Sequence, residues 1–243
     1  MHVVRKVLVV FCLVAIGAAP VLAQQPPVTP PAQPECTEAN LYCPATSTAE
    51  LAKLLNDYPA PGIAAPNTMF VTPDFKVKRA ITQVVKYQIA TKGAVKTSLT
   101  DFKRQVQETL NDDRGWKRLG VQFEYAESGG AFTVVLAEAS QVPSFGSPCD
   151  NVWNCNVGNY VVVNEDRWLN ATESWNAAGG NIRDYRHLTV NHELGHWLGH
   201  DHNSCMTTGQ AAPVMQQQSI DLKGCKFNPW PLDSEVSSTR LGV

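Results

Sequence analysis

The spacing of apolar residues predicts a helix in the middle of the chain. After Ser98 or Thr100, either of which can cap a helix N-terminus, apolar side chains recur every three to four residues at Phe102, Val106 and Leu110. Polar residues and a glycine follow at 111–115 and favour a helix end. A second helix is expected over 181–199, where a glycine can end it.

Other apolar patterns predict strands. Ile81–Ala90 is rich in branched residues, and Val121–Tyr125 alternates apolar with polar side chains, as a half-buried strand does. Phe132–Glu138 predicts a further strand, and the turn at Ser128-Gly129-Gly130 indicates that these last two strands form a hairpin or are sheet neighbours. The continuous apolar run of Tyr160–Asn164 is typical of an interior strand.

The order of these elements predicts an α/β (α+β) fold. Strand, helix, strands and helix follow one another up to Gly199, which fits a twisted mixed sheet with two main helices. After Gly199 we expect little regular structure.

The beginning of the chain has a different composition. Basic Arg5 and Lys6, the apolar run that follows and the small residues before position 24 predict a signal peptide over 1–23, although an uncleaved membrane anchor has a similar pattern. We expect a proline- and glutamine-rich linker over 24–35 and a segment with one short helix over 36–75. A single folded domain is expected over 76–235 and a tail over 236–243.

Length and charge limit the kinds of partner. The chain has 243 residues, 44% hydrophobic residues and a formal net charge of −2, which is typical of a globular domain and gives no indication of nucleic-acid binding. We expect a monomer that is secreted to the outside of the cell, either free or associated with the envelope. No stable membrane association is expected once the signal peptide has been cleaved.

The cysteine count supports export. Of seven cysteines, Cys12 lies in the signal peptide, and the remaining even number suggests disulfides. Six cysteines allow fifteen pairings. Local spacing favours three of them: Cys36–Cys43, Cys149–Cys155 and Cys205–Cys225.

The chemistry of the chain centres on the pattern H-E-x-x-H-x-x-G-x-x-H, which spans 192–202. Residues four apart on a helix lie on one face, so His192 and His196 can direct their imidazoles at one metal ion. Glu193 lies about 100° around the helix, where its carboxylate can reach a water on the metal without binding the metal itself. These residues predict a Zn²⁺ site in which Glu193 is the catalytic base.

The third zinc ligand is expected to be His202. His200 continues the four-residue spacing, but eight residues of straight helix rise about 12 Å, too far for His192 and His200 to share one zinc ion. Gly199 can adopt the left-handed conformation that ends a helix, and the turn can bring His202 back to the metal. We therefore expect His192, His196 and His202 as ligands and His200 outside the ligand set.

The eleven-residue pattern resembles the metzincin metalloproteases. The resemblance implies a methionine in a tight turn below the metal, and Met215 in Ala212–Gln218 lies at a suitable distance downstream. It also implies a sheet with two main helices above the active-site cleft, an irregular C-terminal part below it, and a catalytic domain over 76–235. The longer run from His187 to Pro231 resembles the DUF3152 domain of secreted actinobacterial proteins.

Three histidine ligands leave one position on tetrahedral zinc for water, as in catalytic zinc sites. The expected function is a secreted zinc metalloendopeptidase that hydrolyses protein or peptide substrates, with Glu193 as general base and then acid. A non-catalytic exported protein that contains zinc and binds a peptide or the cell wall is the alternative. Hydrolysis of a cell-wall peptide or another amide uses the same chemistry and stays open.

Several residues have a weaker connection to this site. Asp201 can accept a proton from a ligating imidazole or lie in a solvated turn. Asn191 is a candidate oxyanion stabiliser or a helix-surface amide. His187 is expected to be structural, and Gly195 to allow close packing against the helix. The tryptophans before the second helix are expected in the core or at the rim, or as an aromatic strip for substrate: Trp153, Trp168 and Trp175.

Overall fold

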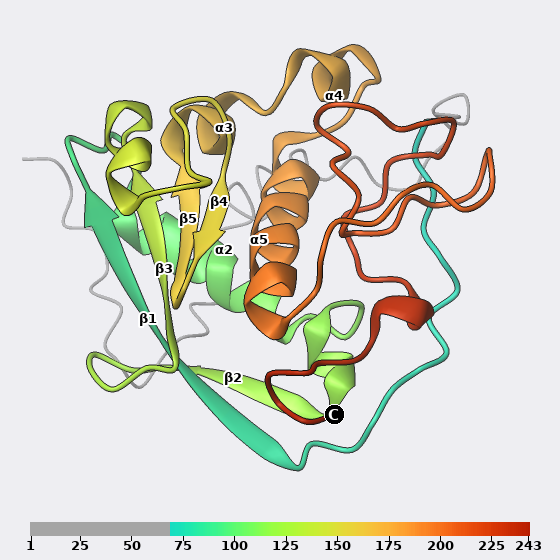
Figure 1. Cartoon of the computed structure of the whole chain (residues 1–243), viewed down its shortest axis with the longest axis horizontal. Helices are drawn as coiled ribbons and strands as arrows, with labels where there is room; N and C mark the ends of the chain where they lie inside the picture. The colour runs from blue at the N-terminus through green and yellow to red at the C-terminus, as the bar shows by residue number, and fades with distance from the viewer. Residues whose placement is uncertain (1–68) are drawn as a thin grey trace, which may run out of the picture. The chain divides into compact units, whose positions relative to one another are not determined.

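A five-stranded mixed sheet organises the part of the chain that the computed structural model describes, residues 69–243 (Figure 1). The strands are β1 (Gln83–Lys92), β2 (Val121–Tyr125), β3 (Phe132–Ala137), β4 (Cys155–Val157) and β5 (Tyr160–Asn164). They lie in the order β2-β1-β3-β5-β4, and β4 alone is antiparallel to its neighbour. The predicted α+β class and mixed sheet are confirmed.

The predicted signal peptide, the linker, the short helix and the Cys36–Cys43 pair lie outside the described residues. The helices of the described part are α2 (Leu99–Asn111), α3 (Glu165–Asn170), α4 (Glu173–Ala177) and α5 (Ile182–Leu198). Three short 3-10 helices accompany them: η1 (Trp116–Leu119), η2 (Ala139–Phe145) and η3 (Asp233–Glu235). No helix within residues 69–243 is both long and apolar enough to cross a membrane.

The two main helices lie where the sequence predicts them. Ser98 caps α2, because its hydroxyl accepts a hydrogen bond from the Asp101 amide at 3.3 Å. Asn181 caps α5 in the same way through the Asp184 amide, and Gly199 ends α5 in the left-handed conformation at φ 102°. The sequence did not indicate β4, α3 or α4.

The predicted pairing of β2 with β3 is wrong. Both strands pair with β1 instead, along its two opposite edges. Residues 83–87 of β1 pair with β2, and residues 87–92 pair with β3. The chain therefore crosses β1 between β2 and β3. A side chain on Gly130 would lie 2.9 Å from Gln88 Cγ and 3.0 Å from the Tyr87 carbonyl carbon, so the crossing needs a glycine.

The core lies between one face of the sheet and the helices α2 and α5 (Figure 1). Alternate residues of β3 divide between the two faces: Val134 and Leu136 join this core, whereas Val135 and Ala137 join a smaller cluster with Val142 of η2. The apolar strand β5 lies between β3 and β4, which confirms its predicted interior position.

Most of the irregular part after α5 lies on the side of that helix away from β3 and β5, and the end of the chain runs back beside β2 (Figure 1). In the stretch 200–243, all of which is described, η3 is the one helical element, and backbone bridges such as Asn203–Gln216 hold the loops. The predicted disulfides Cys149–Cys155 and Cys205–Cys225 are present. Residues 236–243 pack beside the end of α5, where the Ser238 hydroxyl donates to Leu198 O at 2.8 Å.

Candidate metal centre

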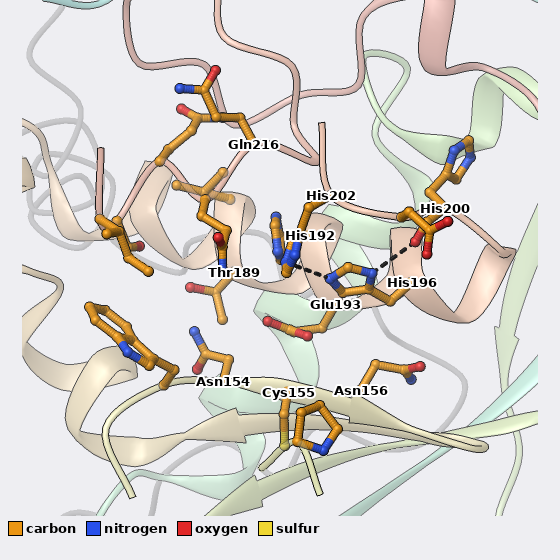
Figure 2. A pocket seen from close by; sticks show the side chains of 18 of the residues that line it. Asn154, Cys155, Asn156, Thr189, His192, Glu193, His196, His200, His202 and Gln216 are labelled. Carbon is orange, nitrogen blue, oxygen red and sulfur yellow. Dashed lines mark hydrogen bonds between the residues drawn. The ribbon is translucent and has the colours of Figure 1, made fainter. Parts of the chain in front are cut away.

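Three imidazoles converge at the C-terminal half of α5. His192 and His196 project from one face of the helix, and His202 returns toward them from the turn after Gly199 (Figure 2). One ligating atom of each residue lies within 4.8 Å of the others, and the Nε2 atoms of His196 and His202 are 3.2 Å apart. Within residues 69–243, no fourth histidine, cysteine or carboxylate side chain joins this group.

Backbone carbonyls orient two of the three rings. His192 Nδ1 lies 2.8 Å from Val214 O, and His196 Nδ1 lies 2.8 Å from His200 O. Because a carbonyl can only accept, each Nδ1 carries the proton and each Nε2 keeps a lone pair that faces the group. An imidazole that binds a metal ion through Nε2 requires this tautomer, with the proton on Nδ1.

Burial also keeps these rings neutral. Burial, together with the neighbouring His196, lowers the pKa of His192 to about 3, whereas the bond to Val214 O acts in the opposite direction. The pKa values of His196 and His202 are lowered by burial as well, and the Asp201 carboxylate partly offsets this. Neutral imidazole is the form that binds a metal ion.

His200 lies outside the group, as expected from the rise of the helix. Its Nε2 is 2.8 Å from Ser237 O, and its ring stacks on Trp116 at 5.1 Å. The turn that ends α5 just before His200 and His202 depends on Gly199, because its φ is 102° and a Cβ at this position would collide with Thr239 Oγ1.

Glu193 lies beside the imidazoles, on the side of the pocket that faces β4 (Figure 2). The side chain is only 5% exposed, and burial raises the pKa of its carboxyl to about 8. A carboxyl group in this environment can hold and release a proton near neutral pH, which is what general acid–base chemistry requires.

Met215 packs against α5 at Gly195, between the positions of His192 and His196 in the sequence. A Cβ on Gly195 would overlap Met215 Sδ, so this glycine is the point of closest approach between the helix and the segment that follows it. Met215 is 1% exposed, and its neighbour Val214 supplies the carbonyl that orients His192.

A buried carboxylate holds the backbone of this methionine segment. Glu235 accepts hydrogen bonds from the amides of Val214 at 2.9 Å, Met215 at 3.0 Å and Leu232 at 2.8 Å. Burial raises the pKa of Glu235, and these three bonds act against that rise. Local sequence gave no signal for Glu235, because it meets Met215 only after the chain has folded back.

The three histidines and Glu193 line a pocket of about 610 Å³. One wall is formed by the Cys149–Cys155 loop and β4, with Trp153, Asn154 and Asn156. The opposite wall is formed by α5, including Thr189, and by 216–220. The sequence did not indicate Asn154 or Asn156 as residues of the site.

The other candidates from the sequence lie elsewhere. Both interpretations of Asn191 are wrong, because its side chain is fully buried and donates to Pro229 O at 2.9 Å. Trp168 and Trp175 are core residues, whereas Trp153 lines the pocket. His187 is buried against Thr109 and Trp230, and the exposed Asp201 acts on the ligands through its charge.

Comparison with known proteins gives one match. No curated protein matches the chain, and no solved structure does. Residues 65–228 match a family described as proteins of unknown function (DUF3152). This stretch contains β1–β5, α5, the three histidines, Glu193 and Met215. Since the match covers more than half of its length, the chain belongs to the DUF3152 family.

Proposed function

We propose that this protein is an exported zinc-dependent metallopeptidase. The observation that carries the proposal is the convergence of His192, His196 and His202 next to the buried carboxyl of Glu193, at the wall of an open pocket. The resemblance of 192–202 to the metzincin pattern supports the same activity.

The residues fit a zinc ion. In a tetrahedral site with zinc–nitrogen bonds of about 2.0–2.1 Å, two ligand atoms lie about 3.3 Å apart. The distance of 3.2 Å between His196 Nε2 and His202 Nε2 agrees with this value. The Nδ1 partners of His192 and His196 leave Nε2 free on both rings. Three nitrogen donors with no fourth side chain among residues 69–243 leave room for a substrate.

The chemistry that zinc supplies when bound is Lewis acidity, which polarises a carbonyl group and acidifies water. Glu193 then takes a proton from the attacking water and delivers it to the leaving amine. Burial raises the pKa of the Glu193 carboxyl, which makes its carboxylate a stronger base toward the attacking water. His192 and His196 keep their orientation through Val214 O and His200 O.

The pocket wall favours a peptide as substrate. β4 is the last strand of the sheet and has a strand partner, β5, on one side only. Its residues Cys155 and Asn156 line the pocket that contains Glu193. An extended peptide can add to such an edge through main-chain hydrogen bonds, which would place its amide groups along the histidines.

Metal analysis and casein cleavage test the proposal. Purified protein should contain one zinc ion per chain and cleave casein. Glu193→Ala should retain zinc but lose activity by about 100-fold or more, the scale of general acid–base catalysis. Glu127→Ala is the matched control, because Glu127 is exposed in the loop between β2 and β3.

Three results would contradict the proposal. Folded protein without zinc would remove the metal site. Equal cleavage by the wild type and Glu193→Ala would remove the catalytic base. A zinc-loaded protein that binds casein peptides but leaves them intact would instead be a binding protein.

A further inference from the structure

A hydrogen bond from β5 holds the side chain of Asn154 in one orientation. Its Oδ1 accepts a hydrogen bond from the Asn164 amide at 2.9 Å. Asn164 is fully buried, and its own side chain is engaged on both sides: Nδ2 donates to Asn151 O at 3.0 Å, and Oδ1 accepts from the Asp166 amide at 3.0 Å. Because a backbone amide can only donate, Asn154 must direct its oxygen at the sheet and its Nδ2 away from it.

The loop that carries Asn154 is fixed as well. The Cys149–Cys155 disulfide closes it, and Asp150 Oδ1 accepts from the amides of Val152 at 2.7 Å and Trp153 at 2.9 Å. Asn154 is the last residue before β4 and therefore moves with the edge of the sheet. A donor mounted in this way loses little entropy when it binds a ligand.

The Nδ2 group faces the pocket. Asn154 lines the same pocket as His192 and Glu193, and Figure 2 shows its amide directed across the pocket toward Thr189 on α5. In the described part of the chain, no protein acceptor is bonded to Asn154 Nδ2. Asn156 differs, because its Nδ2 already donates to Tyr160 O at 2.9 Å within the β4–β5 hairpin.

We propose that Asn154 Nδ2 donates a hydrogen bond to a main-chain carbonyl oxygen of the substrate peptide and so positions that peptide along β4. The inference rests on the proposed peptidase function and adds a residue that holds the substrate. A neutral, fixed amide donor suits a carbonyl oxygen, which every residue of a peptide presents. The contact therefore holds the peptide backbone and does not select a side chain.

Substitution of Asn154 by aspartate tests the contribution of Nδ2 alone. Asn154→Asp keeps an oxygen for the Asn164 amide but replaces Nδ2 by an acceptor, which repels a carbonyl oxygen. Asn154→Ala removes both groups. Asn151→Asp is the charge-matched control, because Asn151 lies in the same loop but is exposed and does not line the pocket.

Binding is measured separately from cleavage. In a zinc-loaded Glu193→Ala background, fluorescein-labelled casein peptides should bind about tenfold more weakly when Asn154→Ala is added, which is the scale of one hydrogen bond. Asn154→Asp should weaken binding at least as much, and Asn151→Asp should not. In the active enzyme, the loss in kcat/KM should come mainly from a higher KM.

The outcomes separate this inference from the proposed function. Unchanged peptide binding by both Asn154 variants, with zinc and thermal stability retained, would overturn the role of Asn154 and leave the peptidase proposal standing. If the wild type does not cleave casein, the peptidase proposal is overturned. The binding measurement would then still show whether Asn154 holds the peptide. If no casein peptide binds the Glu193→Ala protein, the inference fails.

Discussion

Gly195 shows how closely α5 approaches the segment that carries Met215. Gly195 lies between His192 and His196 and faces Met215. A side chain at this position would overlap Met215 Sδ and push the methionine segment away from the helix. Trp116 also packs tightly against Gly195, since its Cζ2 would lie 3.0 Å from a Cβ at this position. Packing at one residue therefore sets the distance between the ligands on the helix and the loop that returns His202.

Gly195→Ala should destabilise the protein by about 1–3 kcal/mol, the usual scale for overpacking a core, and should weaken zinc binding. Met215→Ala alone should also destabilise it, through a cavity. Together the two changes should cost less than their sum, because the smaller residue makes room for the added methyl group. Thermal unfolding and zinc titration of the wild type, the two single variants and the double variant measure these effects. If the two stability losses simply add, residues 195 and 215 are not in contact.

The sequence predicts the candidate metal site at residue scale because its parts lie within eleven positions. A helical repeat places His192 and His196, and a glycine turn places His202, so local geometry is sufficient. Asn154 and Glu235 could not be found in this way, since each reaches the pocket or the methionine segment from a distant part of the chain. Only the fold brings them to the histidines.

At the scale of elements, α2 and α5 meet at a buried polar contact. His187 Nδ1 lies 2.8 Å from Thr109 Oγ1, and the Thr109 hydroxyl donates to Gln105 O at 2.7 Å. The hydroxyl has a single proton, which it gives to Gln105 O, so His187 donates from Nδ1. Burial, together with the charges of Arg183 and Arg114, lowers the pKa of His187 to about 3, and the Asp112 carboxylate acts in the opposite direction.

This contact should make the stability of the helix pair depend on pH. The pKa of His187 is about 3 in the folded protein and about 6.5 in the unfolded chain, so below pH 6.5 the unfolded chain binds the extra proton. Stability is therefore complete above pH 6.5 and falls as the pH falls toward 3. Between pH 7 and pH 5 the loss should be about 2 kcal/mol.

Urea unfolding of the metal-free protein at these two pH values measures the loss. His187→Gln keeps a donor for Thr109 but does not titrate, so its loss should be smaller than that of the wild type by roughly the same 2 kcal/mol. The other titrating groups are common to both proteins and cancel in the comparison. Equal losses would show that His187 does not stay neutral between α2 and α5.

The fold is predictable from sequence element by element, but its assembly is not. The apolar patterns place α2, β1, β2, β3 and β5 within a few residues, and the histidine spacing with the glycine at 199 places α5. They do not show that β1 pairs with β2 along one half and with β3 along the other, because strand order is a property of the sheet and not of any one strand. The three residues of β4 are too few for a pattern of their own.

At the scale of the whole molecule, the candidate site is assembled from two parts that α5 separates. The sheet side contributes the wall with β4 and Asn154, closed by the Cys149–Cys155 disulfide. The C-terminal side contributes His202 and Met215, closed by the Cys205–Cys225 disulfide. The first part would hold the peptide, and the second would supply His202 to the metal site that His192 and His196 form on α5.

The two disulfides should therefore affect different steps. Replacing Cys205 and Cys225 by serine opens a loop with a sequence separation of 20 and should reduce stability by about 3 kcal/mol. It should also weaken zinc binding, because His202 lies three residues before Cys205. Replacing Cys149 and Cys155 should reduce stability by a similar or slightly smaller amount, but it should weaken the binding of casein peptides and leave zinc affinity close to that of the wild type.

Zinc titration and peptide binding on both double variants, in the Glu193→Ala background, provide the comparison. Each disulfide serves as the control for the other, since both variants lose one cross-link and differ only in which wall is released. If both variants lose zinc and peptide in parallel, the disulfides act through global stability alone. If instead the effects separate, each disulfide supports a different step: Cys149–Cys155 supports the binding of the peptide, and Cys205–Cys225 supports the return of His202 to the two histidines of α5.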